Sequence, residues 1–146
     1  MIKHFTILIA FLMTIGSQVS AFDPDHIQSL KNDNACLRCD LKGARLESEN
    51  LKNAYLMDSD LSGAKLRGAD LNRARLKRAI LRSADLSISD LSRSDLSNAI
   101  LIGANLKGAD LSGANLSGAN LEYSYLNGAI LCNTIMPDGS VIYSGC

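Results

Sequence analysis

Leucine recurs at every fifth position of the chain from Leu41 to Leu131, nineteen times without a gap. A five-residue step fits neither regular period. It turns an α-helix by roughly 140° and sends successive side chains to opposite faces of a flat strand. A chain that turns a corner every five residues around one axis keeps each leucine on the inside. The spacing therefore predicts a solenoid whose stacked coils contact only their neighbours.

A second inward position lies two residues before each leucine, and alanine is its most frequent residue. Alternation of large and small side chains lets a narrow core fill without voids. The small exceptions are Cys39, Ser59, Ser89, Ser94 and Ser124. Glu49 breaks the rule, since an inward carboxylate is costly unless it is paired, or unless a local bulge releases it to solvent.

The segments 108–112 (GADLS) and 113–117 (GANLS) match the unit A-(D/N)-L-x-x. Over about residues 37–136 the chain resembles the pentapeptide-repeat family. The resemblance implies an all-β fold, a right-handed quadrilateral β-helix with four pentapeptides in each coil and about five coils here. At a strand spacing of ~4.8 Å, such a tower is about 24 Å tall. The family shares no catalytic residues, so the resemblance implies no active site.

The N-terminus is typical of an export signal. A short basic start precedes an apolar run over 5–15, and Val19 and Ala21 stand where a signal peptidase prefers small residues. The run is too short to span a membrane comfortably, although an uncleaved anchor is the alternative. We expect cleavage after Ala21, export to a periplasm, a lumen or the outside, and no membrane contact afterwards.

We expect four segments: a signal peptide at 1–21, an N-terminal helical cap at 22–36, the β-solenoid at 37–136 and a C-terminal cap at 137–146. Asp23 as N-cap and Pro24 predict a short helix through about Lys31 that covers one end. At the other end, a turn at 137–139 predicts that 141–143 return as a short strand over the last coil.

Four cysteines allow three disulfide connectivities. On a five-coil tower Cys36 and Cys39 lie roughly 20 Å from Cys132, whereas a disulfide needs Cα atoms within about 7 Å. This leaves Cys36–Cys39 and Cys132–Cys146, and it excludes one four-cysteine zinc site. Family members with secretory signals share the C-x-x-C-D-L start and the C-N-T-x-M-P-D-G finish. A thiol-redox protein using the C-x-x-C motif is an alternative, although the usual βαβ context is missing.

Three aspartates, Asp70, Asp90 and Asp110, recur at the twenty-residue period of one coil. Stacked like charges repel, so the column is a candidate cation site, calcium in particular. The competing interpretation is that Asp is an ordinary residue of the repeat at this position. We otherwise expect no metal and no cofactor.

Ile80 and Ile100 occupy an outward position that is usually polar, one above the other, and Ile102 flanks them. This apolar spot is a candidate interface for self-association or for another protein. Surface isoleucines that favour strand geometry are the alternative explanation.

A basic run comprises Lys65, Arg67, Arg73, Arg75, Lys77, Arg78 and Arg82. On a twenty-residue coil it forms a belt, and Lys65 would pair with Asp85 and Arg75 with Asp95 on the next coil. Loss of Lys3 with the signal changes 15 basic against 15 acidic residues to 14 against 15. A net charge of −1 gives no field that attracts nucleic acid, so we expect no nucleic-acid partner.

These features favour an exported, non-catalytic structural or protein-interaction module whose partner is unknown. We expect no enzymatic activity, because one histidine remains after cleavage, hydrolase motifs are missing and a Leu/Ala-filled interior has no substrate pocket. The alternative is the DNA-mimic, topoisomerase-binding role of some pentapeptide proteins. The near-zero charge and the export signal oppose it.

Overall fold

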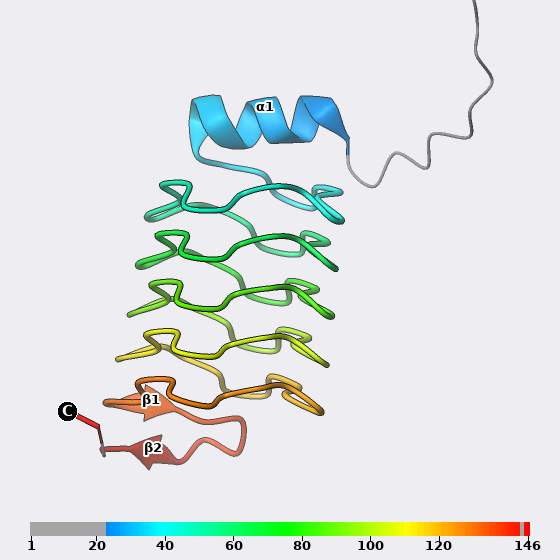
Figure 1. The fold of residues 1–146 in the computed structure, drawn as a ribbon. Helices are drawn as coiled ribbons and strands as arrows, with labels where there is room; N and C mark the ends of the chain where they lie inside the picture. The colour runs from blue at the N-terminus through cyan, green and yellow to red at the C-terminus, as the bar shows by residue number, and fades with distance from the viewer. Residues whose placement is uncertain (1–22, 144) are drawn as a thin grey trace, which may run out of the picture.

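The computed structural model describes residues 23–143 and 145–146, so the expected signal peptide lies outside the described residues. Figure 1 shows stacked coils below a single helix, with a small hairpin at the opposite end. From Ala35 to Asn115, each outward residue forms a parallel bridge with the residue twenty positions later, as Asp40 does with Asp60. Because the pattern turns every five residues, each coil has four sides.

Backbone hydrogen bonds tie each coil to the ones above and below it. The Leu91 N–H donates to the Asp110 carbonyl at 2.8 Å, and the Asp110 N–H donates to the Ser89 carbonyl at 2.9 Å. The corner residue, two positions after each leucine, has a left-handed backbone, for example Gly63 at φ 65° and Arg78 at φ 57°. Glycine adopts this conformation freely, which explains its frequency at the corners.

The interior contains the leucines and small residues that the sequence placed there. The leucines from Leu41 to Leu116 are at most 3% exposed. The inward serines Ser59, Ser89 and Ser94 are at most 1% exposed. The alternation of large and small side chains therefore fills one continuous core along the axis.

Helix α1 (Pro24–Asp33) lies across the N-terminal end of the tower. The Asp23 carboxylate caps it by accepting the Asp25 N–H at 2.9 Å, and Leu30 is buried against the first coil. The helix ends at Asp33, slightly beyond the predicted Lys31. In the part of the chain that the structure describes, no helix is both long and apolar enough to cross a membrane.

Residues around α1 also satisfy backbone groups at the open edge of the first coil. The Asp23 N–H donates to the Asp40 carbonyl at 3.2 Å, and His26 Nδ1 accepts the Asp40 N–H at 3.0 Å. The Asn34 side-chain amide donates to the Lys52 carbonyl at 2.7 Å. The cap therefore replaces part of a missing coil.

A short hairpin lies at the C-terminal end of the tower. Strand β1 (Thr134–Ile135) pairs antiparallel with β2 (Val141–Ile142), so the expected return strand forms. However, it runs along one side and leaves Leu121, Leu126 and Leu131 partly exposed.

Candidate interaction surfaces

The aspartate column stacks as the repeat period requires, through bridges from Asp70 to Asp90 and from Asp90 to Asp110. Each carboxylate accepts a backbone N–H from two residues later, at 2.9–3.0 Å. Such an Asx turn supports the corner of the repeat. Within residues 23–143 and 145–146, no three His, Cys, Asp or Glu side chains are grouped to hold a metal ion. The structure therefore does not support the candidate cation site, because each carboxylate serves its own turn.

The three isoleucines lie on one wall of the tower. A parallel bridge joins Ile80 to Ile100, and both of them and Ile102 are partly exposed. The same column continues with Asp60 before them and Asn120 after them. A short apolar strip thus interrupts an otherwise polar column, at the place that the sequence indicated.

The predicted vertical ion pairs stack in register but are not made. Lys65 bridges Asp85 and Arg75 bridges Asp95 through the backbone, yet neither pair is among the ion pairs of the described residues. The Asp85 carboxylate instead accepts the Ser87 hydroxyl at 2.6 Å. The same carboxylate also accepts the Asn105 side-chain amide of the next coil at 3.1 Å, so hydrogen bonds to neutral groups take the place of the predicted ion pair.

An ion pair that the sequence analysis missed lies at a corner. Arg78 donates to Asp58 through both Nε and Nη2, at 2.6 and 2.8 Å. The hydrogen bonds from Arg78 hold the pKa of Asp58 below its ordinary value. The two residues are twenty positions apart, so a search of the corner positions at the coil period would have found them. Nearby, the Arg75 guanidinium lies 4.6 Å from the centre of the Tyr55 ring.

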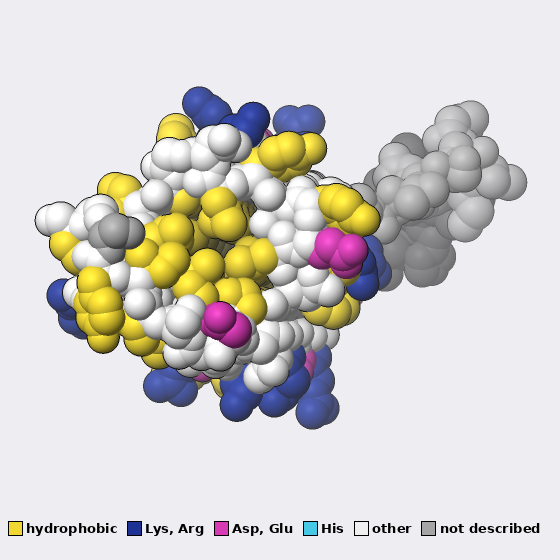
Figure 2. Space-filling view, turned by 90° about the horizontal axis from the view of Figure 1, so that it is seen from below, with side chains coloured by type: hydrophobic (Ala, Val, Ile, Leu, Met, Phe, Trp, Pro, Cys, Tyr) yellow, Lys and Arg dark blue, Asp and Glu magenta, His cyan; other side chains and the backbone are white. Residues whose placement is uncertain are grey.

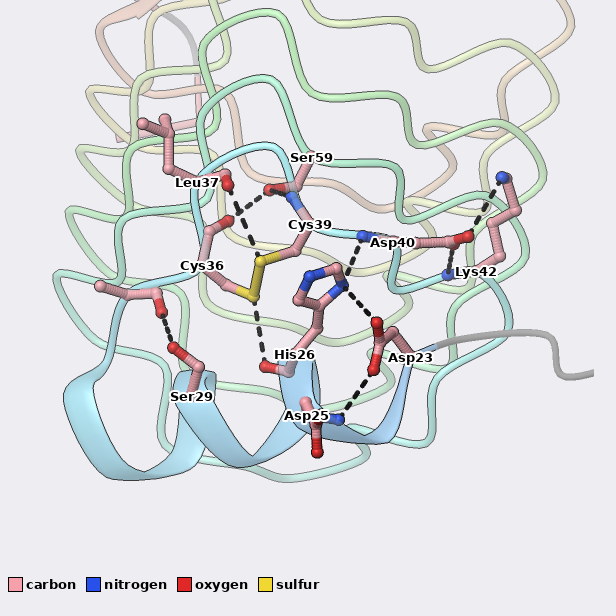
Figure 3. Close-up of a disulfide and its surroundings, with 11 residues drawn as sticks. Asp23, Asp25, His26, Ser29, Cys36, Leu37, Cys39, Asp40, Lys42 and Ser59 are labelled. Atoms are coloured by element: carbon pink, nitrogen blue, oxygen red, sulfur yellow. Dashed lines mark hydrogen bonds and ion pairs between the residues drawn. A yellow bond between two sulfur atoms is a disulfide. The ribbon is translucent and has the colours of Figure 1, made fainter.

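The C-x-x-C motif is a structural bridge beneath α1, as Figure 3 shows. Cys36 and Cys39 are 2% and 6% exposed. The Ser59 hydroxyl accepts the Cys39 N–H at 3.1 Å and donates to the Cys36 carbonyl. The structure also joins Cys132 to Cys146, so both disulfides link the cysteines paired in the sequence analysis, and no described cysteine is free. A bridge buried under a helix gives the thiol-redox alternative no geometric support.

A groove of about 520 Å³ opens between the C-terminal end of α1 and the first coil. Glu49 lies in its lining, is 40% exposed and pairs with Lys31 at 3.1 Å, so its carboxylate does not enter the core. The Asp70 N–H still donates to the Glu49 carbonyl at 3.0 Å, so the backbone ladder continues here. The Glu49 side chain therefore lies in the groove beside α1, where its carboxylate meets Lys31.

The family model for pentapeptide repeats (8 copies) matches residues 36–73, 59–98 and 99–136. Among solved structures, the pentapeptide repeat protein Rfr23 from the cyanobacterium Cyanothece 51142 has 32% sequence identity to this chain. The two structures superpose with a TM-score of 0.60, and the match covers 72% of this chain and 92% of Rfr23. AT2G44920, a pentapeptide repeat protein from the Arabidopsis thaliana thylakoid lumen, is 28% identical, with a TM-score of 0.51 and coverage of 72% and 70%.

A third solved structure, QnrB1, is a plasmid-mediated fluoroquinolone resistance protein. It is 19% identical, with a TM-score of 0.41 and coverage of 70% of this chain and 69% of that one. A likeness this distant carries no argument about function. The search of curated proteins found no match.

Proposed function

Because the chain belongs to the pentapeptide-repeat family, we propose that it is an exported, non-catalytic scaffold that binds a protein partner. Its frame is a right-handed, four-sided β-helix of about five coils with a helical cap. The observation that carries this proposal is the filled core, whose leucines from Leu41 to Leu116 are at most 3% exposed. Such an interior has no room for a substrate, so binding falls to the outer surfaces.

The polar groups support binding rather than catalysis. His26, the single histidine after residue 21, uses Nδ1 to accept the Asp40 N–H. Every buried side-chain nitrogen or oxygen of the described residues has a hydrogen-bond partner. The stacked aspartates are engaged in their own turns. Residues 23–143 therefore bring together no nucleophile and base of the kind that hydrolysis requires.

Two disulfides support export. Disulfides form and persist in oxidising compartments and are rare in the cytosol. The residues before Phe22, which resemble an export signal, also support export. One similar solved protein, AT2G44920, comes from a thylakoid lumen.

The wall that contains Ile80, Ile100 and Ile102 is the proposed docking surface for the partner. These side chains are held on a backbone that is hydrogen-bonded to both neighbouring coils. A partner that docks on this wall would pay little ordering entropy, because the wall is already rigid. The polar residues before and after the isoleucines would form the rim of the contact.

A capture experiment tests the proposal. Tagged protein and its Ile80→Asp/Ile100→Asp variant are incubated with extracytoplasmic extract. The control, Asn105→Asp/Asn115→Asp, adds the same charge at the same repeat position on other walls. We expect the wild type and the control to retain a partner that the isoleucine variant loses, with unchanged β-sheet spectra. Equal retention by all three would exclude this wall, and no retained partner would contradict the scaffold role.

A further inference from the structure

One side of the tower, termed the basic wall below, concentrates positive charge. It consists of three stacked segments, 53–58, 73–78 and 93–98, which parallel bridges join from Tyr55 to Arg75 and from Arg75 to Asp95. Figure 2 views the tower along its axis and shows Lys and Arg side chains crowded along one edge, at the bottom of the view. The cations of the basic wall are Arg73, Arg75, Lys77, Arg78 and Arg93, against the carboxylates Asp58 and Asp95.

Most of these cations have no carboxylate partner in the described chain. The Asp58 carboxylate binds Arg78. The Asp95 carboxylate accepts the Ser97 N–H at 3.0 Å and forms no ion pair with the arginine below it. The remaining cations take part in none of the ion pairs of the described residues, so their charge is open to an outside ligand: Arg73, Arg75, Lys77 and Arg93.

Two of these arginines do not stabilise the fold at their positions. Arg73 and Arg93 occupy successive corners of the same column, with left-handed backbones of φ 58° and 59°. Gly113 fills the next corner of that column, where a residue without a Cβ adopts this backbone freely. Side chains at such corners cost free energy, and like charges on adjacent coils repel. An anionic ligand between the two guanidinium groups would relieve that repulsion.

The arginine contacts indicate which anionic group the basic wall fits. The Arg75 guanidinium lies 4.6 Å from the centre of the Tyr55 ring, and such stacking orients the planar fork. At the adjoining corner, Arg78 binds the Asp58 carboxylate through two donors at 2.6 and 2.8 Å. A carboxylate that arrives from outside can make the same two-pronged contact with the unpaired arginines.

The spacing of the cations favours an extended ligand. Arg73, Arg75 and Lys77 are every second residue along one side of a coil, and alternate residues of an extended backbone lie roughly 6.6 Å apart. An extended peptide laid along this side presents its own alternate side chains at the same spacing. The near-zero net charge of the whole chain does not oppose this contact, because salt screens exposed charges beyond about 8–10 Å.

We propose that the basic wall binds an extended acidic segment of another protein, whose carboxylates pair with Arg73, Arg75 and Arg93. These side chains are exposed, and their backbones are hydrogen-bonded to the neighbouring coils. The inference does not rest on the isoleucine wall, because the cations bind the acidic segment whichever surface meets the rest of the partner.

Fluorescence anisotropy of a labelled peptide tests the proposal with the purified protein. The probe is a peptide of about ten residues that alternates glutamate and serine, which is long enough to cross the basic wall. Its counterpart has glutamine in place of glutamate. We expect the glutamate peptide to bind, more weakly as salt is added, and the glutamine peptide not to bind. A glutamate peptide that fails to bind at low ionic strength, or equal binding of both peptides, would overturn the proposal.

Two variants with the same change in charge separate this wall from general attraction by cations. Arg73→Gln/Arg75→Gln changes the basic wall, whereas Arg45→Gln/Lys65→Gln removes two stacked cations from the opposite wall. We expect the dissociation constant of the glutamate peptide to rise about fivefold or more in the first variant and to stay within about twofold in the second, with unchanged β-sheet spectra. Equal losses in the two variants would rule out a site on the basic wall.

Two further measurements identify the ligand group. Arg73→Lys/Arg75→Lys keeps the charge but removes the planar fork, so it should bind the glutamate peptide more weakly than the wild type does. Equal affinity would contradict the two-pronged carboxylate contact. Vesicles of phosphatidylcholine and phosphatidylglycerol should not cosediment with the protein. Cosedimentation that Arg73→Gln/Arg75→Gln abolishes would make the ligand a membrane surface, and it would overturn the proposal.

Discussion

Replacement of Ser59 by alanine should destabilise the first coils, although alanine is the usual residue at its position. On a regular side, the small inward residue closes the turn directly, as the Ala44 N–H does by donating to the Leu41 carbonyl at 3.1 Å. In the C-x-x-C turn the Ser59 hydroxyl stands between the equivalent groups. It accepts the Cys39 N–H and donates to the Cys36 carbonyl.

The size of the effect follows from burial. Ser59 is 0% exposed, so water cannot replace its hydroxyl, and a buried donor without an acceptor costs about 1–3 kcal/mol. Ser94→Ala is the matched control, because Ser94 has the same repeat position and is 1% exposed. Its hydroxyl donates only to the Leu91 carbonyl, which also accepts the Ser94 N–H. We expect Ser94→Ala to change the free energy of unfolding by less than about 0.5 kcal/mol.

The assay should combine guanidinium unfolding with amide exchange, both with the disulfides intact. In a solenoid each coil contacts only its neighbours, so an end coil can fray before the middle unfolds. We expect Ser59→Ala to accelerate exchange in the first coil and to lower stability more than Ser94→Ala does. Equal losses from the two substitutions would refute the bridging role of the Ser59 hydroxyl.

Three further predictions concern the core, the uncovered corner and the acid range. Leu91→Ala, at a 0% exposed side chain, should cost about 3–5 kcal/mol in denaturant unfolding, and a loss below about 1 kcal/mol would contradict the inward register. Glu49→Ala should change stability by less than about 1 kcal/mol, since its pair with Lys31 is largely exposed; a larger loss in the same assay would mean a buried carboxylate. Burial acts to raise the pKa of Asp60, but hydrogen bonds from Ser62 and a neighbouring lysine outweigh it, so this pKa is lowered. Such a group stabilises the fold above its unfolded pKa of about 3.9 and loses this contribution as the pH falls through its folded pKa. Asp60→Asn should therefore make the melting temperature fall less steeply between neutral and acid pH. An unchanged slope would contradict this role of Asp60.

The sequence was sufficient for the core because the five-residue period admits one kind of backbone. The family resemblance adds that four such units make one coil. The stacking of Ile80 on Ile100 and the separation of the two cysteine pairs then follow. These features depend on a residue's position along the repeat and not on its side-chain conformation. A sequence pattern alone can therefore predict them.

The ends and the ion pairs could not be predicted in this way. Glu49 stays out of the core because its carboxylate lies in the groove beside α1 and pairs with Lys31, a contact that depends on where the helix packs. Lys65 and Asp85 stack as expected, yet the carboxylate binds a nearer hydroxyl. How far the final hairpin covers Leu126 depends on its tertiary path, which the repeat pattern does not contain.

The central claim is that this chain works as an oxidised scaffold outside the cytoplasm, and the intact mass of protein recovered from the exported fraction tests it most directly. The account predicts a chain that begins at Phe22 and is lighter by four hydrogens than its fully reduced form, because two disulfides have formed. A chain that retains residues 1–21 and has four free thiols would contradict both export and the proposed place of action.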